Sequence, residues 1–234
     1  MATSNFPEFV VGIGASAGGL KALEQFFDEL SHNSGAAFVV IQHNSETHEN
    51  LMPALLARHT QMSIYLAEDA LPLIANSVYF VPPGKVLAIR NRTLYLSVPH
   101  KIDDRYQFHF PIDFFFHSLA NDCENRAIGV ILSGSGSDGS NGIRAIHEKG
   151  GIAMVQSPTT AEFDQMPQSA LQTGAIDQVL APGALATLIN ELVTTVFNNS
   201  NLKLISPTSL SESGALRGWG GDLLKNKGAP ASAP

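Results

Sequence analysis

Three side chains of the kinds used in acyl transfer lie just beyond buried, β-type segments of the sequence. They are a serine hydroxyl, an imidazole and a carboxylate: Ser16, His43 and Asp138. In acyl transfer the imidazole takes the serine proton, and the carboxylate fixes the imidazole tautomer and stabilises the imidazolium ion. Because ligands bind beyond the carboxyl ends of strands in an open parallel sheet, we expect these side chains to meet there.

The turn that contains Ser16 is made of small residues, ASAGG at 15–19, between a strand pattern and a helix pattern. Such a turn leaves the hydroxyl exposed and places backbone N–H groups at a helix N-terminus, where they can stabilise an oxyanion. Polar residues at strand ends are common in α/β proteins, so on these residues alone the catalytic set is one hypothesis among several.

The same glycines permit a second interpretation, since Gly12, Gly14 and Gly18 after a strand could form a dinucleotide-binding turn. That fingerprint requires an acidic residue about 20 positions further on, at the tip of the second strand, to bind the ribose. The tip has the sequence Gln-His-Asn, and the nearest acid is Glu46. The sequence therefore disfavours an NAD site.

A metal site and a cysteine nucleophile are two further alternatives. His43, His48 and Glu49 lack the His-Glu-x-x-His spacing, and no helix face would gather them around a metal. The single cysteine, Cys123, lies between two acids, which would raise the pKa of its thiol. One cysteine also excludes an intrachain disulfide and suits a reducing compartment. We expect no metal and no cofactor.

Short β-rich segments alternate with helical patterns, which predicts a doubly wound α/β fold with a mostly parallel sheet and flanking helices. Strands are expected at 9–14, 37–42, 63–68, 128–132, 152–156 and 178–180. Helices are expected at 20–30, 51–59, 112–121, around Ile143 and Ile146, and at 183–197. An insertion of antiparallel hairpins is expected from residues 76–83 and 86–98. On the third helix, Asp113 and His117 lie four apart and are expected to form a surface ion pair.

Composition and charge exclude several classes of function. The chain has 234 residues, 44% of them apolar, and a formal net charge of −7. An acidic balance without a basic run disfavours a nucleic-acid partner. No apolar run reaches the length of a membrane span, and the first residues contain no signal sequence. We expect a soluble, cytoplasmic protein without membrane insertion.

Composition also divides the chain into three parts. We expect an N-terminal arm at residues 1–8, a catalytic domain at 9–198, and a flexible tail or linker at 199–234. Asn, Ser, Gly, Pro and Ala dominate this last part, as they do in linkers.

Six segments together resemble the CheB-type protein-glutamate methylesterases, which act on chemotaxis receptors. The segments are VGIGASAGG at 11–19, VIQH at 40–43, YFVPPG at 79–84, PID at 111–113, GVILSGSGSDG at 129–139 and FDQMP at 163–167. They follow one another in order between about residue 9 and about residue 188. Any one segment is a weak signal, whereas the set is specific.

The resemblance implies Ser16 as the nucleophile, His43 as the general base and Asp138 as the orienting carboxylate. The implied reaction is hydrolysis of glutamate γ-methyl esters on methyl-accepting chemotaxis receptors to glutamate and methanol, and some family members also deamidate receptor glutamines. Two positions depart from the common family pattern: Ala17 replaces a threonine and Ser135 replaces a methionine. Their backbone N–H groups can still act as oxyanion donors.

The architecture also departs from that of many family members, which carry a receiver domain ahead of the esterase. Here eight residues precede the first expected strand. The variant motifs and the linker-like tail resemble an esterase module fused to a receptor methyltransferase domain, so the chain is expected to be either part of such a fusion, with a fused or partner methyltransferase domain, or a stand-alone enzyme. Without a receiver, constitutive activity is expected. The alternative is a non-catalytic receptor-docking or regulatory module of the same fold, which the presence of all three reacting residues disfavours.

Overall fold

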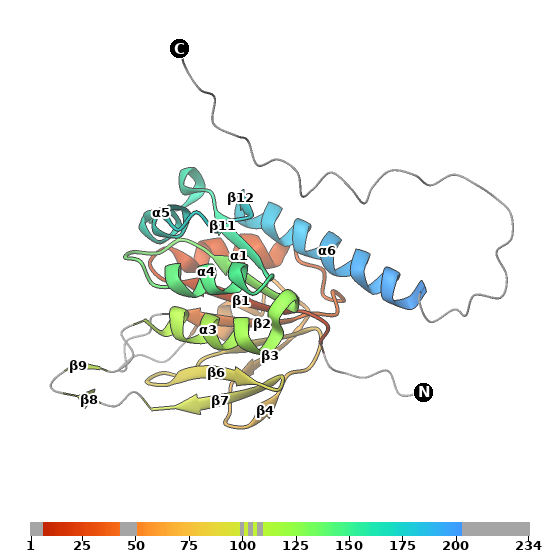
Figure 1. Ribbon diagram of the computed structural model, residues 1–234, viewed down its shortest axis with the longest axis horizontal. Helices are drawn as coiled ribbons and strands as arrows, with labels where there is room; N and C mark the ends of the chain where they lie inside the picture. Colours follow the sequence, from red (N-terminus) through yellow and green to blue (C-terminus); the bar gives the residue numbers. More distant parts are fainter. Residues whose placement is uncertain (1–6, 43–50, 99–100, 103–104, 107–109, 203–234) are drawn as a thin grey trace, which may run out of the picture.

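A seven-stranded parallel sheet forms the centre of the computed structural model, which describes residues 7–42, 51–98, 101–102, 105–106 and 110–202 (Figure 1). The strand order is β12-β11-β10-β1-β2-β5-β3. The strands are β1 (Val10–Ala15), β2 (Ala37–Gln42), β3 (Ser63–Leu66), β5 (Ser77–Phe80), β10 (Ala127–Ile131), β11 (Ile152–Gln156) and β12 (Gln178–Leu180). Every neighbouring pair is parallel, which confirms the expected doubly wound α/β sheet.

The chain reverses its direction across the sheet at β1. After β1 it adds β2, then β3 at the edge and β5 between β2 and β3, and it then returns to place β10 on the other side of β1. The connections that leave β1 and β10 therefore lie next to each other at the carboxyl edge of the sheet. In open α/β sheets this switch point is where ligands bind.

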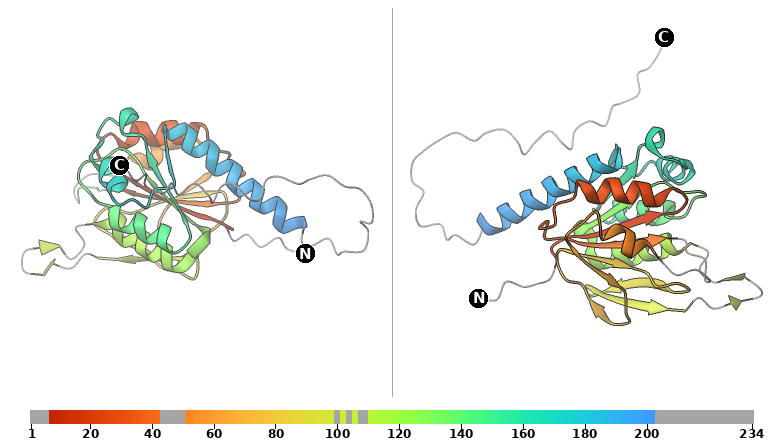
Figure 2. Two further views of the ribbon diagram at one scale, coloured as in Figure 1. Left: turned by 45° about the horizontal axis from the view of Figure 1, so that its top comes forward. Right: turned by 180° about the vertical axis from the view of Figure 1, so that it is seen from behind.

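Helices cover both faces of the sheet (Figures 1 and 2). One face packs against α1 (Gly19–Asp28), α2 (Met52–Leu56) and α6 (Pro182–Leu202), and the other against α3 (Pro111–Cys123), α4 (Ser140–Glu148) and α5 (Gln165–Gln172). Successive strand residues point to opposite faces. Accordingly, Val11 and Ile13 pack in the apolar core on the α1 and α6 side of the sheet, whereas Val10 packs in the core on the α3 and α4 side.

Gly12 and Gly14 allow α3 to approach β1 closely. A Cβ atom on Gly12 would lie 2.9 Å from Phe116 and Leu119, and one on Gly14 would lie 2.5 Å from Ile112. Both glycines are inside the strand rather than in the turn that follows it. Helix packing therefore explains the two glycines that had suggested a dinucleotide-binding turn.

A smaller antiparallel sheet packs beneath α3, with the strand order β4-β7-β6. Its strands are β4 (Leu71–Pro72), β6 (Val86–Arg90) and β7 (Thr93–Ser97). Asn91 and Arg92, both at positive φ, form the two-residue turn between β6 and β7, as hairpins of this kind require. The hairpin expected within 86–98 is thus confirmed. A two-residue pair, β8 (Lys101–Ile102) with β9 (Arg105–Tyr106), follows.

The expectation of an antiparallel hairpin at residues 76–83 is wrong. Residues 77–80 form β5, which pairs in parallel with β2 on one side and β3 on the other. All four of its residues are buried, and burial on both faces is typical of strands inside a parallel sheet.

The remaining differences concern helices. The second helix spans only Met52–Leu56, α5 was not expected, and α6 continues to Leu202, beyond the expected domain limit at 198. Two short 3-10 helices, η1 (Glu124–Arg126) and η2 (Pro158–Thr160), complete the described elements. Within the described residues, the helices are all too short or too polar to cross a membrane.

Candidate active site

Ser16 lies at the carboxyl end of β1, in a turn that contains only Ser16, Ala17 and Gly18 before α1 begins. Gly18 caps the helix with φ +70°, a conformation that glycine adopts without strain. The Gly19 N–H donates to the Ser16 carbonyl oxygen over 2.9 Å. The serine is half-buried, and no described residue bonds to its Oγ. The hydroxyl is therefore available for chemistry.

The loop between β10 and α4 lies directly beside this turn, because β10 pairs with β1. The pairing continues beyond the strands: Leu132 N–H donates to Gly14 O over 2.9 Å, and Ser16 N–H donates to Ser133 O over 3.0 Å. A Cβ atom on Gly134 would lie 3.0 Å from Ser16 Cβ and 2.0 Å from Met166 Sδ. Only glycine at this position lets the loop pass so close to the serine.

Asp138, near the end of the same loop, is 3% exposed and binds the first turn of α3. Its Oδ2 accepts the Ile112 N–H over 3.0 Å, and its Oδ1 accepts the Asp113 N–H over 2.9 Å. Two backbone donors at a helix N-terminus stabilise the ionised carboxylate. The carboxylate is thus held in one orientation on the side of the loop that meets α3.

Asp113 makes the reciprocal contact with α4. Its Oδ1 accepts the Gly142 N–H over 2.7 Å, and its Oδ2 accepts Asn141 Nδ2 over 3.3 Å. The two helices therefore cap each other through a pair of carboxylates. The expected surface ion pair with His117 is wrong: Asp113 is 8% exposed and occupied by α4, and His117 is exposed. Burial against a helix N-terminus offers the carboxylate better donors than a surface imidazole.

Ile112 packs between β1 and the end of the β10–α4 loop. Its Cγ2 would lie 2.5 Å from a Cβ atom on Gly14 and 2.8 Å from one on Gly139. Gly14 is two residues before Ser16, and Gly139 directly follows Asp138. One side chain of α3 therefore packs against both the strand that carries the serine and the loop that carries the aspartate.

His43 lies outside the described residues, as do His48 and Glu49. β2 ends at Gln42, which pairs with Ala15, so the chain leaves β2 beside the residue before Ser16. The structure thus places Ser16 and the Asp138 loop together at the carboxyl edge of the sheet. The position of His43 relative to them stays a prediction.

Two backbone N–H groups beside Ser16 are without an acceptor in the described part of the chain: those of Ala17 and Ser135. The N–H groups on either side of Ser135 are engaged, because Gly134 N–H donates to Phe163 O over 2.9 Å and Gly136 N–H to Gln165 Oε1 over 3.1 Å. The family resemblance implies the N–H groups of Ala17 and Ser135 as oxyanion donors, and that role stays a prediction.

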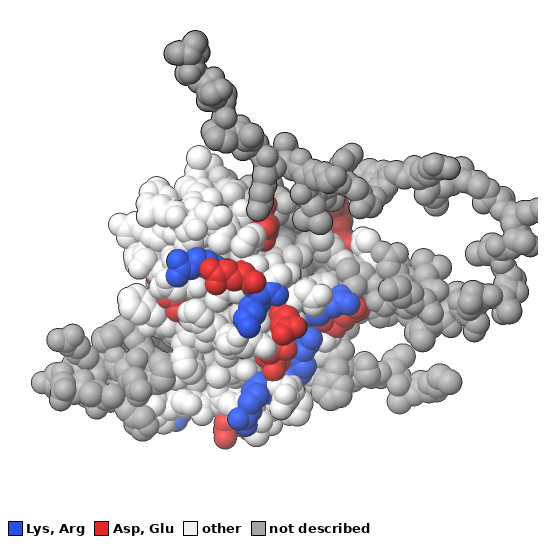
Figure 3. Space-filling view, in the orientation of Figure 1, with Lys and Arg blue, Asp and Glu red and all other residues white. Residues whose placement is uncertain are grey.

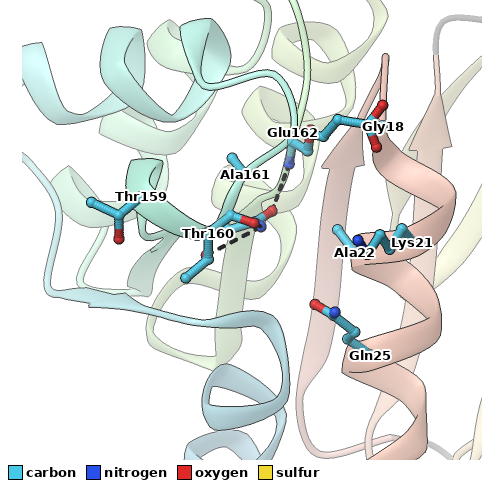
Figure 4. A pocket seen from close by; sticks show the side chains of 10 residues that line it. Gly18, Lys21, Ala22, Gln25, Thr159, Thr160, Ala161 and Glu162 are labelled. Carbon is cyan, nitrogen blue, oxygen red and sulfur yellow. Dashed lines mark hydrogen bonds between the residues drawn. The ribbon is translucent and has the colours of Figure 1, made fainter.

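A cavity of about 550 Å³ opens at Ser16. It adjoins a second cavity of about 270 Å³ between α1 and residues 159–162, and the two share Gly18, Lys21 and Glu162. Figure 4 shows Lys21 and Gln25 of α1 on one side of the second cavity, with Thr160 and Glu162 on the other. There is room beside the serine for a side chain of a protein substrate.

Uncharged side chains surround the other side of the site. Residues 133–137 and α5 contain no Asp, Glu, Lys or Arg, and the surface over α5 is accordingly white in Figure 3. The charged side chains visible in that view gather instead in a band over α4 and α3. The rim on the α5 side therefore offers hydroxyl and amide groups to a substrate.

Gln156, at the end of β11, supports the loop and was not singled out in the sequence. It is 1% exposed; its Oε1 accepts the Ser133 N–H over 2.8 Å, and its Nε2 donates to Thr160 O over 3.0 Å. The sequence feature that could have indicated this role is a polar residue at the end of an otherwise apolar strand.

Cys123 is unsuited to nucleophilic chemistry. It is 4% exposed at the far end of α3, and burial raises the pKa of its thiol to about 12. The expected direction of the shift is confirmed, although burial rather than the neighbouring acids is the main cause. Within the described residues, no group of three or more His, Cys, Asp or Glu side chains could hold a metal ion.

Comparisons with known proteins agree on one family. The family model described as CheB methylesterase matches residues 11–189. A putative protein-glutamate methylesterase/protein-glutamine glutaminase of Leptospira interrogans is 34% identical over 190 residues, which cover 80% of this chain and 95% of the relative. The crystal structure of the Thermotoga maritima CheB methylesterase catalytic domain has a TM-score of 0.69 and 27% identity, over 79% of this chain and 98% of that domain.

A third relative is much longer. An uncharacterised 104.1 kDa protein of Rhodobacter capsulatus is 44% identical over 129 residues, which cover 55% of this chain but 13% of the relative. The chain thus spans nearly the full length of the Leptospira protein and a small part of the Rhodobacter protein.

Proposed function

The chain belongs to the CheB methylesterase family, and from this we propose that it is a serine esterase acting on glutamate γ-methyl esters of chemotaxis receptors. The products are glutamate and methanol. The observation that carries the proposal is the available Ser16 hydroxyl beside the Asp138 loop, with the N–H groups of Ala17 and Ser135 next to it. Relatives named protein-glutamate methylesterase/protein-glutamine glutaminase favour an enzyme over a non-catalytic docking module.

In the proposed first step, Ser16 Oγ attacks the carbonyl carbon of the ester while His43 accepts its proton. The negative charge that develops on the carbonyl oxygen is stabilised by the N–H groups of Ala17 and Ser135. The tetrahedral intermediate collapses when the C–O bond to the methoxy group breaks, and His43 returns its proton to that oxygen. Methanol leaves, and the glutamyl group stays esterified to Ser16.

In the second step, His43 takes a proton from water and the resulting nucleophile attacks the glutamyl ester. The intermediate collapses when its bond to Ser16 Oγ breaks, His43 returns the proton to that Oγ, and a free glutamate side chain is released. A receptor glutamine in place of the methyl ester would release ammonia through the same sequence. The naming of these relatives as protein-glutamine glutaminases as well supports this second activity.

Asp138 is assigned the task of holding His43 in the correct tautomer and stabilising its charged form. Its two hydrogen bonds to the N-terminus of α3 support this role, because they hold the carboxylate in one orientation. The same hydrogen bonds make Asp138 part of the framework between α3 and α4.

The proposed partner is the cytoplasmic part of a methyl-accepting chemotaxis receptor, which places the enzyme in the cytoplasm. A fused or partner methyltransferase domain would supply the esters that this site removes. The length of the Rhodobacter relative supports a module of this kind within a larger chain. No cofactor takes part in the proposed reaction.

The test is methanol release from a methylated receptor fragment. We expect release by the wild-type chain and a rate lower by at least about 1,000-fold for Ser16→Ala. His43→Ala should be similarly slow, since it disables the same proton transfer. Ser63→Ala, which changes an exposed serine on the edge strand β3, serves as the matched control and should retain full activity.

Two outcomes would contradict the proposal. An inactive wild-type chain on an esterified fragment would leave the non-catalytic docking module as the better function. A Ser16→Ala variant within about tenfold of wild type would exclude Ser16 as the nucleophile.

A further inference from the structure

The Ser133 hydroxyl joins the serine turn to the segment before α5. Ser133 is 1% exposed. Its Oγ donates to Ala17 O over 2.9 Å and accepts the Phe163 N–H over 3.0 Å. The Phe163 carbonyl oxygen lies 3.3 Å from the same Oγ, so the hydroxyl proton has two acceptors, and the shorter hydrogen bond is the one to Ala17 O. Because the hydroxyl is buried, water cannot easily take over its hydrogen bonds if it is removed.

Ser133 holds the chain on both sides of Ser16. Its own carbonyl oxygen accepts the Ser16 N–H over 3.0 Å, which fixes the peptide before the nucleophile. Its hydroxyl fixes the peptide after Ala17. Between them, the peptide that joins Ser16 to Ala17 is fixed by Gly19, whose N–H donates to Ser16 O. Three successive peptide groups are therefore restrained, two of them by one residue.

These restraints determine where the Ala17 N–H points. A trans peptide is planar, and its N–H points opposite to its carbonyl. With the peptides before and after it held by Ser133, the Ser16–Ala17 peptide has little freedom to rotate. Small errors in the direction of a catalytic donor are costly, since a displacement of about 1 Å can lower a rate about 100-fold.

We propose that Ser133 is a positioning residue of the esterase, which acts by holding the Ala17 carbonyl and thereby the Ala17 N–H that stabilises the oxyanion. The inference rests on the proposed function above. Ser133 itself does not touch the substrate; it acts through Ala17.

The surroundings keep the Ser133 hydroxyl in place. Gln156 Oε1 accepts its N–H over 2.8 Å, and the next residue, Gly134, donates to Phe163 O over 2.9 Å. A Cβ atom on Gly18 would lie 2.7 Å from Ser133 Oγ. The glycine at the end of the turn thus permits the close approach that the hydrogen bond to Ala17 requires.

Ser118 offers a matched control within the same chain. Its Oγ donates to Phe115 O over 2.7 Å and accepts the Ile89 N–H over 3.0 Å. This is the same pattern of one donated and one accepted backbone hydrogen bond. It joins α3 to β6, away from the carboxyl edge of the parallel sheet.

The experiment measures kcat, KM and Tm for methanol release from the methylated receptor fragment. Ser133→Ala should lower kcat by about 10- to 100-fold and leave KM within about twofold. Ser133→Thr keeps the hydroxyl and should restore kcat to within about threefold of wild type. Ser118→Ala should lower Tm by a similar amount to Ser133→Ala, with kcat unchanged.

A folded Ser133→Ala variant with kcat within about threefold of wild type would overturn the inference. So would an equal fall in kcat for Ser118→Ala, or a Ser133→Thr variant as slow as Ser133→Ala. If Ser133→Ala does not fold at the assay temperature, Ser133→Cys takes its place with the same expectations, since a thiol is a weak donor. An inactive wild type would overturn the proposed function and this inference together, whereas an active wild type with an unaffected variant overturns this inference alone.

Discussion

The two connections that meet at the site differ in length and in what holds them. The β1–α1 turn consists of residues 16–18, whereas the β10–α4 loop consists of residues 132–139. Both end in a glycine at positive φ that caps the next helix, Gly18 at +70° and Gly139 at +91°. Both reacting residues therefore lie in a strand-to-helix connection that ends in a glycine cap; the connection is short for the serine and long for the aspartate.

The short turn takes most of its shape from its own backbone and from Ser133, near the start of the long loop beside it. The long loop takes its shape from elements distant in sequence, since Asp138 binds the start of α3 and Gly136 binds Gln165 of α5. A change in the short turn should therefore affect chemistry alone. A change in the long loop should affect chemistry and folding together.

The largest expected effect is that of Ser16→Ala on the rate. Loss of the nucleophile should lower kcat by several orders of magnitude. Because no described residue bonds to Ser16 Oγ, the free energy of unfolding should stay within about 0.5 kcal/mol of wild type. Urea denaturation beside the methanol assay checks both parts. A clearly destabilised variant would show that the short turn depends on its side chain after all.

Asp138→Ala should affect both quantities. We expect a rate about 1,000- to 10,000-fold lower. We also expect a loss of about 2–4 kcal/mol in the free energy of unfolding, because two buried backbone donors lose a charged acceptor. The methanol assay measures the first effect and urea denaturation the second. A variant as stable as wild type would mean that the long loop does not depend on its contact with α3.

Asp113→Ala removes the reciprocal cap and should act mainly on stability. A loss of about 1–2 kcal/mol is expected from the loss of the cap on α4. A severalfold lower rate should accompany it. The variant keeps the backbone N–H that Asp138 binds, but loss of the contact with α4 should loosen the first turn of α3, where that N–H lies.

Asp122→Ala is the matched control for that change. Like Asp113, Asp122 accepts hydrogen bonds from a segment distant in sequence, here the backbone N–H groups of Asn91 and Arg92 on the β6–β7 turn. It should lower stability by a similar amount and leave the rate unchanged. A slower Asp122→Ala enzyme would show that loss of stability alone slows the reaction.

The smallest expected effect is at the far end of α3. Because burial raises the pKa of the Cys123 thiol to about 12, the thiol stays protonated at neutral pH and reacts slowly. Iodoacetamide at pH 7 should leave the folded enzyme fully active, and Cys123→Ala should keep wild-type kcat. Inactivation by the reagent that Cys123→Ala prevents would contradict this.

The sequence predicts the regular part of the fold well. The strands at 37–42 and 152–156 coincide with their apolar runs, because a strand buried inside a parallel sheet has a continuous apolar sequence. The strand at 77–80 was assigned to the wrong sheet, since its composition does not record which strand it pairs with. α5 was missed because few of its side chains are buried, among them Met166 and Ala170.

The site is predictable to a similar extent. The turn at Ser16 follows from small residues between a strand and a helix, and its position beside the Asp138 loop follows from the topology. The exchange of caps between Asp113 and Asp138 is not predictable, because it joins residues 25 positions apart through backbone N–H groups that every sequence has. The role of the Ser133 hydroxyl is hidden for the same reason.

The contact of Ile112 with Gly14 and Gly139 has a consequence for sequence variation. The three positions share one small space, in which a longer side chain at either glycine would need a shorter one at Ile112. Substitutions in contact are rarely additive. In a library of random variants, tolerated changes at these positions should therefore occur in combination rather than singly. The distance between the strand that leads to the nucleophile and the loop that carries the aspartate therefore depends on the sizes of these three residues together.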